Sequence, residues 1–121
     1  MMMLLQILTL VVATADVPRP DTSTAEAPVA AELERLGVEV ELRPRRAEGW
    51  GAYAISLHAH GFDEEADVAY AEAMRLDADE FKWPYFRAIV AAKTDVSGAL
   101  EWLEDALAID AVSYTHLTLP T

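Results

Sequence analysis

The sequence predicts an all-α fold built from helix-turn-helix repeats, and two observations support this prediction. First, residues 47–111 match themselves at a single offset of 33 residues. The matched pairs are Trp50 with Trp83, Ala66 with Ala99, Tyr70 with Leu103, Ala73 with Ala106, Leu76 with Ile109 and Asp77 with Asp110. Repeats of this length are typical of arrays in which helix pairs stack on one another. Second, the apolar residues of each copy recur at intervals of three and four, as on the buried face of a helix.

The positions of Asp, Gly and Pro set the expected helix boundaries. Asp63 and Asp95 stand where second helices would begin, and their carboxylates can accept hydrogen bonds from the free N–H groups of the first turn. Pro84 suits a first turn because its missing N–H costs nothing there. Gly61 falls in the turn between the first two helices. We therefore expect helices at residues 48–59, 64–76, 84–92 and 96–109.

The order of small and large residues in each copy resembles the tetratricopeptide repeat family. The first copy supplies Trp50, Tyr53, Ala54, Leu57, Ala66, Tyr70 and Ala73, and the second supplies Trp83, Phe86, Val90, Ala99, Leu103 and Ala106. The closing Pro of the family pattern is replaced by Ala78 and Ala111, and Arg87 stands where a small residue is expected. A deletion of one residue in the first helix of the second copy would explain the period. The resemblance implies an α-solenoid fragment with two repeats, at 47–79 and 80–111.

The same resemblance implies a function. Tetratricopeptide arrays bind peptide segments or other proteins in a concave groove lined by the first helix of each repeat. The chain is therefore expected to be a non-enzymatic scaffold or adaptor with a protein or peptide partner. The groove residues implied here are Glu48, Ala52, Ile55, His58, Tyr85 and Ala88. The alternative, from another functional class, is an N-terminal repeat module of a larger exported enzyme that truncation has removed.

The N-terminus has the pattern of a signal peptide. Its first 12 residues are apolar except for Gln6 and Thr9, a run too short to cross a bilayer as a helix. The small-x-small pattern at 13–15 predicts cleavage before Asp16, and hence export to the periplasm or the exterior with no stable membrane insertion afterwards. No Lys or Arg precedes the apolar run, so an uncleaved N-terminal anchor or a misplaced start codon remains an alternative.

Residues 16–46 are expected to form a linker. Its first part contains three Pro residues among Ser, Thr and Asp, a composition that disfavours regular structure. Pro28 and Gly37 would start and stop one short helix at 28–36. Residues 38–42 alternate as a strand does, but they have no evident partner strand, so we expect an extended linker there.

The charge balance excludes several functions. The chain has 9 Lys plus Arg against 21 Asp plus Glu, a net charge of −12. Nucleic-acid binding needs clustered cations, and the cluster available, at residues 43–46, resembles a solvated turn. The chain has no Cys. His58 and His60 are two residues apart and therefore point to different faces of a helix, so we expect no metal site, no cofactor and no catalytic centre.

The last ten residues differ abruptly from those before them. Residues 112–121 contain no Asp, Glu, Lys or Arg. One possible coding of them resembles the transposon-end adapter used to prepare sequencing libraries, so we interpret this tail as an artefact and residues 47–111 as a fragment. The alternative is a genuine β-prone C-terminal segment. With two repeats, Trp102, Leu103 and Leu107 are expected to have an uncovered outer face.

Overall fold

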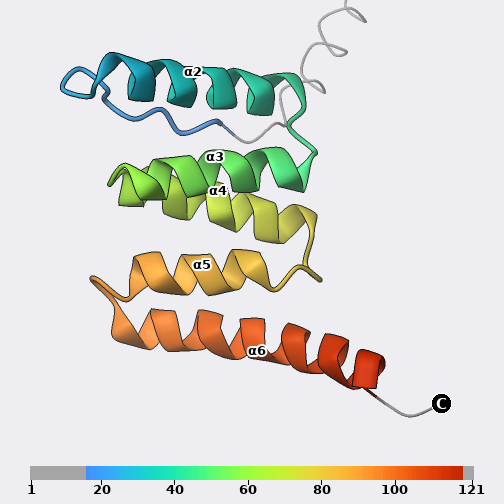
Figure 1. Ribbon diagram of the computed structural model, residues 1–121. Helices are drawn as coiled ribbons and strands as arrows, with labels where there is room; N and C mark the ends of the chain where they lie inside the picture. The colour runs from blue at the N-terminus through green and yellow to red at the C-terminus, as the bar shows by residue number, and fades with distance from the viewer. Residues whose placement is uncertain (1–15, 119–121) are drawn as a thin grey trace, which may run out of the picture.

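The computed structural model describes residues 16–118, with side chains as far as Asp110, so the predicted signal peptide lies outside it. The described residues form five packed helices and no strand, which confirms the all-α prediction. The helices are α2 (Ala27–Leu42), α3 (Ala47–Ala59), α4 (Asp63–Leu76), α5 (Lys82–Ala91) and α6 (Val96–Thr118). Figure 1 shows them stacked in chain order, with α2 at one end and α6 at the other.

Small residues allow the central helices to approach closely. The most extensive contacts join α3 with α4 and α5 with α6, while α4 also packs on α5 and α2 on α3. Ala54, Ala66 and Ala73 are completely buried where α3 meets α4. Around them, Trp50, Tyr53, Leu57 and Tyr70 are almost completely buried as well. The expected pairing of 48–59 with 64–76 is therefore present, with small side chains at the contact and large ones around it.

The predicted boundaries of the first three helices agree with the structure to within two residues. Gly61 has a φ of +84°, the only positive φ among the described residues, and it forms the turn between α3 and α4. The Gly98 N–H donates to Asp95 Oδ1 over 3.0 Å, so the expected cap of α6 is confirmed. The expected cap by Asp63 is wrong: α4 begins without a side-chain cap, and Asp63 Oδ2 pairs with Lys93 Nζ at 2.8 Å.

The expected end of the last helix is also wrong. The backbone of α6 continues past Ile109 to Thr118. Residues 112–118 are therefore helical, which contradicts the alternative of a β-prone segment. Their interpretation as a sequencing artefact stays a prediction.

Two further expectations about residues 28–42 are wrong. Helix α2 does not stop at Gly37, and 38–42 is helical rather than extended. The reason lies in the packing of α2 on α3, which buries Leu33, Gly37 and Val40 on one face. Burial of Val40 requires the helix to continue, and this outweighs the weak helix propensity of Gly37 and of the β-branched residues after it.

The segment before α2 packs against the helices instead of forming a separate linker. We call residues 16–25 the strap; it runs alongside α2 in the opposite direction (Figure 1). Val17 packs on the same core as Leu33 and Val40, and Arg19 forms ion pairs with two glutamates of α2. The N-terminal region and the helical stack therefore share one hydrophobic core.

Burial of Tyr70 predicts a loss of stability at alkaline pH. Desolvation in the core raises the pKa of Tyr70 to about 12 from an ordinary value of 10.0. Because the folded-state pKa is the higher one, the stabilisation is complete below pH 10 and is lost as the pH rises toward 12. By pH 11.5 the loss should reach about 2 kcal/mol.

Urea unfolding at pH 8 and pH 11.5 measures this loss, and Tyr70→Phe is the matched variant. Burial raises the pKa of Tyr53 as well, and this second tyrosine is present in both chains. We therefore expect Tyr70→Phe to lose about 2 kcal/mol less than the parent between the two pH values. Equal losses in the two chains would show that Tyr70 does not titrate from within the core.

Candidate functional site

The exposed side of α3 carries three of the residues implied by the repeat resemblance. Glu48, Ala52 and Ile55 are exposed, and intervals of four and three place them on one face of the helix. Ile55 keeps 45% of its surface exposed. The opposite face holds the buried Trp50, Tyr53 and Leu57. This face of α3 is therefore available for contacts outside the described chain.

His58 lies at the edge of that face and is half-buried. Its ring meets the ring of Tyr70 edge to face, with centroids 6.2 Å apart and planes at 85°. Contact with a buried tyrosine fixes the orientation of the imidazole. His60 is exposed at the end of α3. Among residues 16–110, no group of three His, Asp or Glu side chains lies close enough together to hold a metal ion.

The corresponding face of α5 differs by one residue from the expectation. Tyr85 is 43% exposed, as expected, but Ala88 is 2% exposed and faces the core. The exposed position is occupied by Ile89, which is 42% exposed and lies one turn after Tyr85. Phe81, one turn before Tyr85, is also exposed. The one-residue deletion inferred in this helix is the signal by which the sequence could have identified Ile89.

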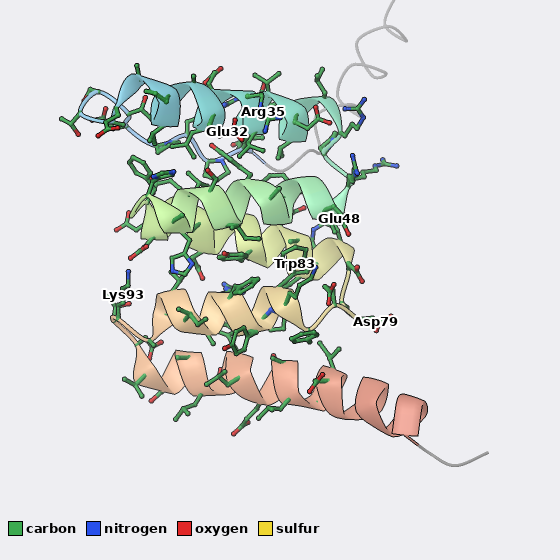
Figure 2. All side chains as sticks on the ribbon, viewed as in Figure 1. Glu32, Arg35, Glu48, Asp79, Trp83 and Lys93 are labelled. Carbon is green, nitrogen blue, oxygen red and sulfur yellow. The ribbon has the colours of Figure 1, made fainter. Side chains whose placement is uncertain are left out.

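Trp83 brings α5 close to α3. A Cβ atom added to Gly51 would lie 2.0 Å from Cη2 of the Trp83 ring, so the indole lies directly on the bare backbone of α3. Figure 2 shows Trp83 extending from α5 toward α3 and α4. The exposed residues of α3 and α5 therefore belong to neighbouring helices. We name the set Glu48, Ala52, Ile55, Phe81, Tyr85 and Ile89 the first-helix face.

Arg87 explains its departure from the repeat pattern. Its Nε donates to Asp67 Oδ1 on α4 over 2.8 Å, and its guanidinium lies 4.1 Å from the centroid of the Trp102 ring on α6. A hollow of about 590 Å³ adjoins this cluster. The Lys93–Asp63 ion pair joins the turn after α5 to α4 on the same side (Figure 2). Arg87 therefore occupies the place of a small residue and connects three helices by an ion pair and a cation–π contact.

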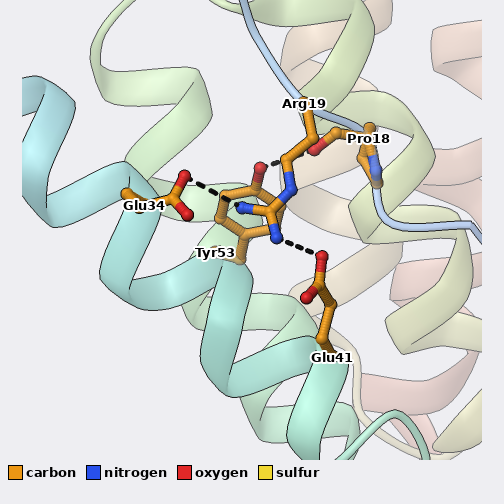
Figure 3. Close-up of polar contacts among 5 residues, drawn as sticks. All are labelled: Pro18, Arg19, Glu34, Glu41 and Tyr53. Atoms are coloured by element: carbon orange, nitrogen blue, oxygen red, sulfur yellow. Dashed lines mark hydrogen bonds and ion pairs between the residues drawn. The ribbon is translucent and has the colours of Figure 1, made fainter.

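The strap forms a second polar cluster that the sequence did not reveal. The Tyr53 hydroxyl donates to the Pro18 carbonyl oxygen, and the Arg19 guanidinium lies between the carboxylates of Glu34 and Glu41 (Figure 3). A hollow of about 460 Å³ lies beside Arg19 and Pro20. No spacing in the sequence links residue 19 to residues 34, 41 and 53, so these contacts could not have been predicted.

Comparison of the sequence with protein-family models and with curated proteins found no match. Within the described residues, no helix is both long and apolar enough to cross a membrane.

Proposed function

We propose that the chain is an exported adaptor of the tetratricopeptide kind, which binds a protein or peptide segment non-covalently on the first-helix face. The observation that supports this proposal is the exposure of Ile55, Tyr85 and Ile89 on two neighbouring helices whose other sides are buried. Exposed apolar residues gathered on one surface are typical of an interaction site. An extended or helical segment can bind such a face through a few apolar side chains.

The burial pattern of α2 supports the repeat architecture on which this proposal rests. The buried residues of α2 are Leu33, Gly37 and Val40. Each precedes by 33 residues a buried residue of α4, namely Ala66, Tyr70 and Ala73. Val17 on the strap likewise precedes Trp50 by 33 residues, and it packs on the same core. The strap and α2 thus have the spacing of a third, degenerate copy in which an extended segment replaces the first helix.

The charge of the chain narrows the class of partner. A net charge of −12 attracts a segment that carries Lys or Arg and repels nucleic acid. The apolar side chains of the first-helix face favour a partner with apolar residues between those cations. We therefore expect the preferred partner to be a basic, partly apolar protein segment.

Selection from a random peptide library with the full chain tests this function. Selected peptides should be enriched in apolar residues and in Lys or Arg, and Ile89→Asp should weaken their binding about tenfold or more, measured by fluorescence anisotropy. Leu107→Asp is the matched control, because Leu107 is 65% exposed on α6, outside the first-helix face. It should leave binding unchanged. Equal effects of the two substitutions, or no enrichment, would contradict the proposal.

A further inference from the structure

Helix α2 presents a slot that fits a guanidinium group. Glu34 and Glu41 are two turns apart on one face of α2, and Gly37 lies between them. A Cβ atom at Gly37 would lie 2.1 Å from Nη1 of Arg19, so the guanidinium occupies the space that any other residue would fill. Arg19 Nη1 reaches Glu34 Oε2 at 3.4 Å, and Nη2 pairs with Glu41 (Figure 3). A planar, forked cation can contact both carboxylates, whereas the single ammonium of lysine is suited to only one.

Helix α3 contributes recognition of the main chain beside this slot. The Tyr53 hydroxyl donates to the carbonyl oxygen of Pro18, the residue before Arg19. The neighbouring Val17 is inserted into the core. An apolar side chain, a main-chain carbonyl and a guanidinium are thus bound in succession along an extended segment. This combination of contacts is the one that peptide-binding sites use.

The strap is bound in the manner of an exchangeable ligand. The hydrogen bonds described between the strap and the helices come from two groups, the Tyr53 hydroxyl and the Arg19 guanidinium. The ion pairs are solvent-accessible, with side-chain exposures of 35% for Arg19, 69% for Glu34 and 53% for Glu41. Ion pairs of this exposure contribute little to stability. Release of the strap therefore sacrifices few strong interactions.

The strap also leaves its site incompletely filled. The hollow of about 460 Å³ beside it is lined by both strap residues and helix residues, including Pro20, Leu33 and Tyr53. On the repeat architecture proposed above, this is where the first helix of a repeat would lie, and an extended segment is thinner than a helix. The site is therefore wide enough for a segment bulkier than the strap.

We propose that this slot on α2 and α3 is a second peptide-binding site, specific for an extended segment with an arginine between prolines. The strap occupies it within the chain, and a segment of the same chemistry from a partner displaces the strap. The slot uses Glu34, Gly37, Glu41 and Tyr53, none of which belongs to the first-helix face. The inference therefore stands apart from the function proposed for that face.

A synthetic peptide tests the proposal directly. The probe is fluorescein-labelled DVPRPDT, the sequence of residues 16–22, with DVPAPDT as the matched control. The full chain carrying Arg19→Ala should bind the first peptide and not the second, and the parent should bind the first at least about tenfold more weakly because its strap competes. Adding Gly37→Ala to the Arg19→Ala chain should abolish binding, because the new Cβ fills the guanidinium position. Ile89→Asp should have no effect.

A second measurement uses the parent strap intact. The chain has no Cys, so Ser23→Cys places a single fluorophore on the exposed part of the strap. Titration with DVPRPDT should lower the anisotropy of this label in a saturable manner, and DVPAPDT should not. Absence of binding to a folded Arg19→Ala chain, or an unchanged anisotropy, would overturn the proposal. So would equal binding of the two peptides, or a change of anisotropy that comes only from dimerisation.

Discussion

An Ala66→Trp chain should unfold at markedly lower urea concentration and temperature than the parent. Ala66 is completely buried on α4, where that helix packs on α3. Its neighbours across the contact include fully buried aromatic side chains that cannot make room for an indole without separating the helices. Overpacking of a core costs about 1–3 kcal/mol and sometimes more. We expect the upper part of that range, because the replaced side chain is a single methyl group.

Val68→Trp is the matched control for this prediction. It places the same side chain on the same helix, at a position that is 49% exposed. Its free energy of unfolding should remain within about 0.5 kcal/mol of the parent. Far-UV circular dichroism during urea unfolding measures both variants. Equal stability of the Ala66→Trp and Val68→Trp chains would show that α3 and α4 do not pack as described.

The helical elements could be predicted because their signals are local. The period of the buried residues, the positive φ of Gly61 and the Asp95 cap each act within one or two turns of the chain. The packing of α3 on α4 followed from the alternation of small and large residues. These features depend little on what lies elsewhere in the molecule, so the sequence was sufficient to locate them.

The N-terminal region could not be predicted because its structure depends on distant partners. Gly37 resembles a helix stop when seen alone, yet it lies inside α2 because the Arg19 guanidinium needs the space of its missing side chain. Similarly, residues 38–42 have a strand-like alternation, but Val40 is buried within the same core as α3 and α4. In both cases tertiary packing outweighed the local preference of the residues.

The candidate site shows both outcomes within one helix. Tyr85 is exposed as the resemblance implied, because its place is fixed by the neighbouring Trp83. Ala88 is buried and Ile89 exposed, since a shift of one residue turns a helix by about 100°. Arg87 satisfies its charge with Asp67 on another helix, a contact that no pattern within α5 predicts. The face of a helix follows from sequence only when its register is certain.

Gly51→Ala should destabilise the chain, although alanine is ordinarily the better helix former. Gly51 is buried on α3, and the Trp83 ring lies where its Cβ would be placed, 2.0 Å from Cη2. Trp83 is itself only 4% exposed, so the ring has little free space into which it can move. We expect a net loss of about 1–3 kcal/mol in the free energy of unfolding, typical of core overpacking.

Gly49→Ala is the matched control, because it makes the same substitution two residues earlier in α3. A Cβ atom at Gly49 meets nothing within 4 Å, so the substitution should stabilise the chain by up to about 1 kcal/mol through helix propensity. The opposite signs of the two effects isolate the contact between α3 and Trp83, which joins the two halves of the first-helix face. If both substitutions stabilised the chain, Trp83 would not pack on α3, and the first-helix face could not be a continuous binding surface.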